Sequence, residues 1–220
     1  MSTAADRHGA GGFRYGALLL LAIGVAVFAL IAPDSEGVRA LELLAAGATL
    51  LVAVLTSRAP LARRRAAGVV VAVAVVGAGI AAAVGSPNPA LTFSACALLL
   101  ALTASVILAG LVRLIVERGV VLQAVFGALA VYVLVGLTFG FVIGAIAAGS
   151  STEYFASGTD ASQSTRVYFS FTTLTTTGYG DYTAATRGGR ALAVLEMLLG
   201  QLYLVTVISL LVANFRRGRR

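Results

Sequence analysis

Long runs of apolar residues, separated by short polar segments, dominate the hydrophobic pattern of this chain. The polar segments hold most of the charged residues, and the runs contain few. Because an α-helix needs about 20 apolar residues to cross the hydrocarbon core of a bilayer, each run is long enough to be a transmembrane helix. Six such runs are predicted, at residues 15–32, 38–56, 66–84, 91–112, 120–148 and 190–213.

A shorter segment between the last two runs has a different pattern. Residues 149–165 are polar and rich in Ser, Thr and Gly, and residues 166–177 combine aromatic residues with threonines. A segment that enters a membrane without crossing it is tolerated only where protein or water surrounds it. We therefore expect an all-α membrane protein with six transmembrane helices and a re-entrant helix between the fifth and the sixth.

Composition supports a membrane protein and argues against an enzyme. The chain is 59% hydrophobic and 11% charged, with a mean hydropathy of +0.97, and a soluble domain of 220 residues could not bury so much apolar surface. His8 and Cys96 are the single histidine and the single cysteine, so the sequence offers no metal cluster, catalytic triad or disulfide framework. We expect no organic cofactor.

The basic residues predict the orientation in the membrane. All 16 are arginines, and they lie mainly in short segments between apolar runs, which indicates membrane topology rather than nucleic-acid binding. On the side of the N-terminus lie 12 of them: Arg7, Arg14, Arg58, Arg63, Arg64, Arg65, Arg113, Arg118, Arg216, Arg217, Arg219 and Arg220. The other side has 4, namely Arg39, Arg166, Arg187 and Arg190. Both termini are therefore expected in the cytoplasm, and the protein in the cytoplasmic membrane. Removal of residues 15–32 with a signal peptide is disfavoured, because Leu30 stands where a small residue is needed before the cleavage site.

The segment Thr175-Thr176-Thr177-Gly178-Tyr179-Gly180-Asp181 follows the short half-span. A dehydrated potassium ion needs oxygens that replace its water shell, and backbone carbonyls from four copies of an extended loop supply them; T-V-G-Y-G filters are the general example of this mechanism. Gly178 and Gly180 permit backbone conformations that a Cβ would obstruct, and the Thr176 hydroxyl adds an oxygen at the inner end.

On these residues, about 120 to 213 of the chain resemble the pore domain of tetrameric potassium channels. The resemblance implies potassium as the permeant ion, with Thr176, Thr177, Gly178, Tyr179 and Gly180 as the filter. One filter segment per chain implies a homotetramer, since a pore needs four. The lysine-free composition suggests a bacterial six-span member of the family. The domains expected are a cytoplasmic segment 1–14, a four-helix membrane domain 15–118, a pore domain 119–213 and a basic tail 214–220.

Two residues depart from the family pattern. Thr177 replaces the common valine, which either loosens the packing behind the filter or adds a hydrogen bond there. Thr172 stands where some relatives keep a glutamate, so we expect Asp181 either to accept a hydrogen bond from Tyr168 or to remain a solvated carboxylate that attracts cations. Both alternatives stay open, as does a non-selective cation channel in place of a potassium-selective one. A third alternative is a non-conducting accessory membrane subunit.

The last run resembles the inner helix of the family. By that resemblance Gly200 is the gating hinge, and Gln201, Leu204 and Ile208 line the cavity. Glu196 is unexpected there, because a carboxylate in the middle of a membrane helix usually has a partner or a function. Either it braces the filter by bonding threonine hydroxyls or Tyr132, or its protonation makes the channel sensitive to pH.

The first four runs do not predict a voltage sensor. Such a sensor needs several arginines inside one span, and residues 91–112 contain no charge. We expect these helices to brace the pore or to hold lipid, and we expect Ser94, Thr103 and Ser105 to bond their own helix backbone. Anionic lipid or membrane topology alone would each explain the arginines at 63–65 and at 216, 217, 219 and 220.

Overall fold

The computed structural model describes residues 13–57, 61–83, 88–118, 120–158, 162–209 and 211. Within this part of the chain the regular structure is helical, apart from one isolated β-bridge. The elements are α1 (Phe13–Ile31), α2 (Glu36–Thr56), α3 (Leu61–Ala83), α4 (Pro89–Arg118), α5 (Leu122–Gly149), α6 (Gln163–Leu174), α7 (Arg187–Tyr203) and the π-helical turn η1 (Leu204–Ile208).

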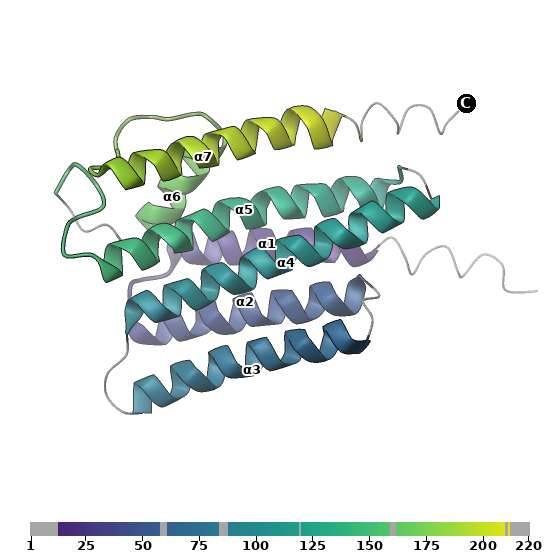
Figure 1. The fold of residues 1–220 in the computed structure, drawn as a ribbon, viewed down its shortest axis with the longest axis horizontal. Coiled ribbons are helices and arrows are strands. Elements are labelled where there is room, and N and C mark those ends of the chain that lie inside the picture. Colours follow the sequence, from purple (N-terminus) through teal and green to yellow (C-terminus); the bar gives the residue numbers. More distant parts are fainter. Residues whose placement is uncertain are drawn as a thin grey trace, which may run out of the picture.

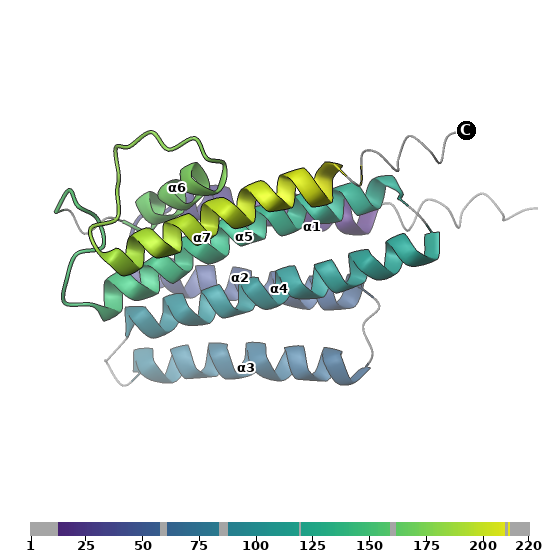
Figure 2. The ribbon, with the colours of Figure 1, turned by 45° about the horizontal axis from the view of Figure 1, so that its top comes forward.

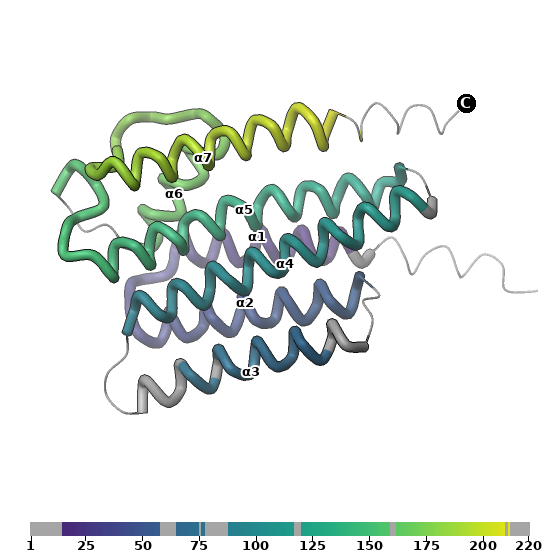
Figure 3. Tube along the Cα trace, in the orientation of Figure 1, coloured from purple at the N-terminus to yellow at the C-terminus, as the bar shows by residue number. Residues whose placement is uncertain are grey.

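The long helices run side by side, with α3 at one edge of the bundle and α7 at the other (Figures 1 and 2). Helix α5 lies between α1, α4 and α6, and α2 packs against α1, α3 and α4. The short helix α6 lies at the end of the bundle where α1 connects to α2. Figure 3 follows the chain from α6 through residues 175–186 into α7 at this same end.

Each of the six predicted runs contains one long helix, but several boundaries differ. Helix α4 continues to Arg118, so Arg113 lies within the helix rather than just beyond it. Helix α6 begins at Gln163 instead of Arg166, because the side chain of Ser162 caps it by accepting the N–H of Thr165. It ends at Leu174, three residues before the predicted end.

Four helices of the described chain are long and apolar enough to cross a membrane: Glu36–Thr56, Pro89–Val116, Leu122–Gly149 and Arg187–Ile208. The apolar stretches Tyr15–Ile31 and Arg65–Ala74, in α1 and α3, are shorter. The fold is therefore that of an all-helical membrane protein. Residues 1–12 and 212–220, which include the predicted N-terminal segment and basic tail, lie outside the described residues.

Three glycines of α5 let α6 approach its backbone. Gly136, Gly140 and Gly144 are four residues apart and so lie on one face of the helix. A Cβ at these positions would lie 2.8 Å from the ring of Phe171, 3.0 Å from the Cα of Val167 and 2.8 Å from the side chain of Gln163. All three contacts are with α6, so these glycines determine how deeply α6 is seated in the bundle.

Three hydroxyl side chains of α4 bond to the backbone of their own helix. Ser94 donates to the carbonyl of Ala90, Thr103 to Leu99 and Ser105 to Ala101. Each bond runs to the preceding turn of the same helix, which confirms the prediction.

Candidate functional site: the segment between α6 and α7

The backbone of the segment after α6 alternates in conformation. The φ angles of Thr176, Gly178 and Gly180 are +57°, +52° and +80°, whereas Thr177 and Tyr179 between them do not have positive φ. In an extended strand successive carbonyls point to opposite sides. An alternation of left-handed and right-handed residues can instead turn successive carbonyls to one side. The predicted filter residues thus have an unusual backbone, which glycine tolerates best.

The same segment is tied to the end of α6 by its N–H groups. Thr177 and Gly178 both donate to the carbonyl of Thr172, at 2.9 and 3.1 Å. In a trans peptide the N–H of one residue points opposite to the carbonyl of the residue before it. The carbonyls of Thr176 and Thr177 must therefore point away from α6, and residues 175–181 are exposed in the single chain.

Thr172 contributes through its main chain rather than its side chain. Its hydroxyl donates to the carbonyl of Phe169 in its own helix, and its carbonyl receives the two filter N–H groups. The threonine hydroxyls are engaged locally: Thr175 Oγ1 lies 2.9 Å from Thr177 Oγ1, and Thr176 donates to the carbonyl of Thr175 at 2.7 Å. Thr177 thus adds a hydroxyl bond in this segment, one of the two alternatives expected for it.

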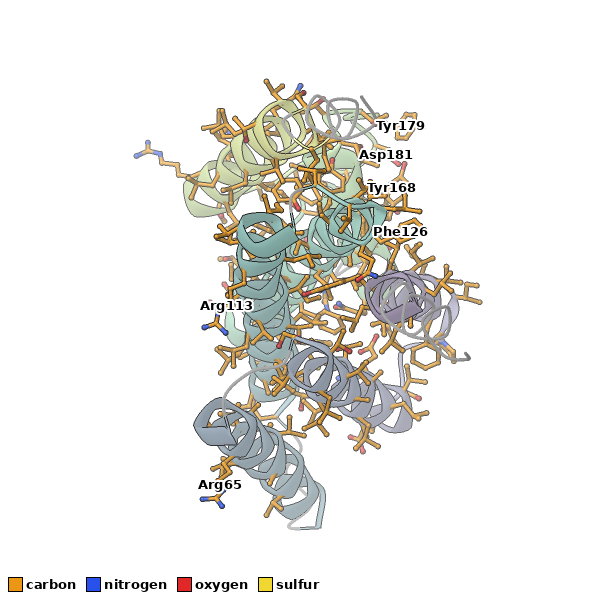
Figure 4. All side chains as sticks on the ribbon, turned by 90° about the vertical axis from the view of Figure 1, so that its right-hand side faces the viewer. Arg65, Arg113, Phe126, Tyr168, Tyr179 and Asp181 are labelled. Atoms are coloured by element: carbon orange, nitrogen blue, oxygen red, sulfur yellow. The ribbon has the colours of Figure 1, made fainter. Side chains whose placement is uncertain are left out.

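Tyr168 on α6 connects to the far end of the segment. Its hydroxyl donates to the carboxylate of Asp181 at 2.9 Å, which is one of the two alternatives expected from the sequence, and this bond raises the pKa of the phenol. Its ring stacks on that of Tyr179, with centroids 6.4 Å apart and an interplanar angle of 3°. Figure 4 shows Tyr168, Tyr179 and Asp181 on one side of the molecule. Tyr168 therefore contacts both the last part of the filter segment and the residue after it.

An aromatic cluster that the sequence did not predict supports the chain beyond Asp181. Phe155 pairs with Ala184 in the isolated β-bridge, and the N–H of Ala185 donates to the carbonyl of Tyr154 at 2.9 Å. The rings of Tyr154, Phe155 and Phe169 meet edge to face, with centroids 5.0 to 6.2 Å apart. Burial raises the pKa of the Tyr154 phenol. The sequence feature from which this cluster could have been predicted is the aromatic pair Tyr154-Phe155 within an otherwise polar stretch.

The beginning of α6 is held by residues distant in sequence. The N–H of Gln163 donates to both carboxylate oxygens of Asp34, at 3.2 and 3.3 Å. The guanidinium carbon of Arg166 lies 5.5 Å from the ring centroid of Phe93 on α4, within the range of a cation–π interaction. Helix α4 and the α1–α2 connection thus both contact α6.

Gly200 packs against the other end of α6. A Cβ at Gly200 would lie 2.2 Å from the carbonyl oxygen of Leu174. This distance is too short for any side chain unless the carbonyl moves. The hydroxyl of Tyr132 on α5 donates to the same carbonyl at 3.3 Å. Helix α7 continues through Gly200, and the irregular turn η1 follows at Leu204–Ile208. Close packing accounts for glycine at this position.

The residues expected to line the cavity have different surroundings. Gln201 is exposed in the single chain, and Leu204 is half-buried. Ile208 packs partly against a cluster that contains Leu111 of α4 and Ala128 of α5. Its side chain therefore has apolar contacts within its own chain.

Glu196 is fully buried, with 0% of its surface exposed. Its Oε1 is hydrogen-bonded to the hydroxyl of Ser170 on α6, which also lies 2.6 Å from the carbonyl of Gly136 on α5. The expected partners were threonine hydroxyls or Tyr132, and this was wrong, because Tyr132 bonds Leu174 instead. Glu196 does point toward α6 and α5, as its helical position predicts.

Most side chains of the two arginine clusters, at 63–65 and 216–220, lie outside the part of the chain that the structure describes. Arg65 is exposed, and Figure 4 shows it directed away from the bundle, as it shows Arg113. The side chains of Arg63 and Arg64, and all of Arg216, Arg217, Arg219 and Arg220, lie outside the described part of the chain.

Comparison with known protein families finds a similarity over the C-terminal part of the chain. A protein family described as ion channel matches residues 127–217, which span most of α5, the whole of α6, the filter segment and α7. No curated protein and no solved structure matches the chain. The similarity supports an ion channel in a membrane and points away from an enzyme. It covers the part of the chain in which the sequence placed the pore.

Proposed function

We propose that this chain forms a homotetrameric, potassium-selective channel in the cytoplasmic membrane. Thr176, Thr177, Gly178 and Tyr179 offer their carbonyls to dehydrated K⁺, with the Thr176 hydroxyl at the inner end. Gly180 is the last residue of the filter. The filter is supported by Asp181, Tyr168, Thr172 and Glu196. Carbonyl oxygens replace the hydration shell of the ion without forming a covalent intermediate.

One observation carries the proposal: the carbonyl of Thr172 receives the N–H groups of both Thr177 and Gly178. These bonds direct two successive filter carbonyls away from α6, and the alternating positive φ angles extend the pattern to Gly180. Thr176 at positive φ and the bond from Thr177 also form a common helix C-cap at the end of α6, whereas the bond from Gly178 and the positive φ angles of Gly178 and Gly180 continue beyond that cap. The C-terminus of α6 adds its negative dipole end near the inner end of the segment, which favours a cation.

The exposed faces of the single chain support the proposed tetramer. The filter residues 175–181 are exposed, and one chain supplies one quarter of a fourfold site. Helix α7 and the turn after it also expose large apolar side chains, namely Val194, Leu195, Leu198, Leu199, Leu202 and Val205. In the proposed assembly these side chains meet neighbouring subunits, the cavity or lipid.

The arginine distribution and the helix arrangement support one orientation. The beginning of α1 and the end of η1 lie at the same end of the bundle, opposite to α6 (Figure 1). The arginine-rich side of the membrane then contains both termini, and the filter opens to the outside. Arg63, Arg64, Arg65, Arg216, Arg217, Arg219 and Arg220 are available to anionic lipid headgroups on the cytoplasmic side, each charge contributing about 1 kcal/mol near such a surface.

Reconstitution into liposomes tests the function. The purified protein should migrate as a tetramer and carry K⁺ flux, with a reversal potential close to that of K⁺ when K⁺ and Na⁺ gradients oppose each other. A reversal potential near zero would identify a non-selective cation channel instead. A monomer without flux for either ion would overturn the proposal in favour of an accessory subunit.

A further inference from the structure

The hydroxyl of Ser170 has one proton and two oxygen neighbours. Its Oγ lies 2.6 Å from the carbonyl oxygen of Gly136 and is also hydrogen-bonded to Oε1 of Glu196. A carbonyl can only accept, so the bond to Gly136 uses the single proton of the serine. The contact between Ser170 and Glu196 then requires a second proton, and a protonated carboxyl group is the available donor.

The surroundings of Glu196 favour the neutral form for an independent reason. Glu196 and Ser170 are both 0% exposed, and Oε2 of Glu196 has no hydrogen-bond partner among the described residues. Tyr132 on α5 and Tyr154 before α6 are the titratable groups that interact with it electrostatically. Burial is the largest influence on its carboxyl group, followed by the hydrogen bond with Ser170. A buried carboxylate without a cation or a full set of donors is strongly disfavoured, and such groups take up a proton.

We propose that Glu196 is a neutral carboxylic acid whose Oε1 proton is donated to Ser170, which in turn donates to the carbonyl of Gly136. This chain of two hydrogen bonds joins α7, α6 and α5. Glu196 is a positioning residue, because Ser170 lies two residues before Thr172, whose carbonyl holds the filter N–H groups. The proton assignment rests on hydrogen bonding alone, whereas its effect on conduction rests on the proposed function.

The proposal fixes the direction of the pH dependence. Raising the pH removes the proton from Glu196, which leaves one serine proton for two acceptors and an unpaired charge in the protein interior. Ser170 must then release either Gly136 or Glu196, so the attachment of α6 weakens. Conduction should fall at alkaline pH, and acidification should change nothing through this group.

Infrared difference spectroscopy tests the proton directly. At neutral pH the spectrum of the wild-type protein minus that of Glu196→Gln should contain the carbonyl band of a protonated carboxyl group. The matched control is Glu153→Gln, because Glu153 is exposed and its difference spectrum should contain carboxylate bands only. Carboxylate bands in the Glu196→Gln difference spectrum, in place of the protonated-carboxyl band, would overturn the proposal.

Flux measurements across pH test the positioning role. Glu196→Gln keeps a donor for Ser170, so it should conduct as the wild type at neutral pH and lose the alkaline decline. Ser170→Ala should reduce flux several-fold, and Ser170→Thr, which keeps the hydroxyl, should restore it. An unchanged alkaline decline in Glu196→Gln would refute the role. If no protein conducts, wild type included, the proposed function fails, while the infrared result still decides the protonation state.

Discussion

The carboxylate of Asp34, in the connection between α1 and α2, receives the backbone N–H of Gln163 at 3.2 and 3.3 Å. The two residues are 129 positions apart in the sequence, and the bond joins the four-helix domain to the first residue of α6. A negative charge at this point also complements the positive end of the α6 dipole. The N-terminal helices therefore hold α6 by a specific polar contact as well as by packing.

Removing this contact should destabilise the protein. Asp34→Ala should lower the free energy of unfolding by about 1 kcal/mol, the usual cost of losing a cap at a helix N-terminus. The measurement is the thermal unfolding midpoint in detergent, followed by circular dichroism. Glu153→Ala is the matched control, since Glu153 is an exposed carboxylate that lies outside the helices. A wild-type midpoint in Asp34→Ala would show that the Asp34 contact contributes nothing.

Gly178→Ala should abolish selective potassium flux. Gly178 has a φ of +52°, and an alanine held there costs about 1–2 kcal/mol. Relief of that strain requires the peptide to turn, which breaks the bond to Thr172 and redirects the carbonyl of Thr177. Flux through liposomes measures the result, with Gly188→Ala as the control, because a Cβ at Gly188 meets nothing within 4 Å. Selective flux that survives in Gly178→Ala would disprove the filter assignment.

Tyr168→Phe should alter inactivation of the filter while leaving the fold intact. The substitution removes the 2.9 Å bond to Asp181 but keeps the ring that stacks on Tyr179. The decay of current during sustained activation should therefore become faster or slower than in the wild type. Tyr182→Phe is the control, because the Tyr182 ring contacts Tyr168 without bonding Asp181 through its hydroxyl. Wild-type kinetics in Tyr168→Phe would assign Asp181 the role of a solvated carboxylate.

Voltage dependence should be weak. Helix α4 contains no charge between Pro89 and Val112, and its first arginine, Arg113, lies near the end of the helix. Without charges that move through the field, opening cannot be steeply coupled to voltage. Conductance measured across a range of potentials should change little. A steep curve that corresponds to several gating charges per channel would contradict this expectation.

Gly200→Ala should weaken the attachment of α7 to α6. The new Cβ would have to displace the carbonyl of Leu174, and overpacking of this kind costs about 1–3 kcal/mol. We expect a lower unfolding midpoint together with reduced flux, whereas Gly188→Ala on the same helix should match the wild type. If Gly200 acts as a hinge alone, gating will change and the unfolding midpoint will not.

The long helices and the position of the proposed filter segment could be predicted from the local sequence. Uninterrupted apolar runs predicted where the long helices lie, because each run is a property of consecutive positions, although several helix ends differ by five or six residues. The spacing of Gly178, Gly180 and Asp181 predicted the position of a filter segment. The bond from Tyr168 to Asp181 was predicted because both residues lie close in the sequence to that segment, on either side of it.

The sequence by itself thus determined an all-helical membrane protein and predicted a filter segment between its last two long helices. Only the tertiary structure decided what holds that segment. Asp34, Ser170 and the glycines at 136, 140 and 144 have no local pattern that connects them to α6. Glu196 was noticed for its charge, but its partner was not predictable, because hydrogen bonds between helices depend on how the helices rotate and pack. Those contacts join residues far apart in the chain, and no window of consecutive residues contains both partners.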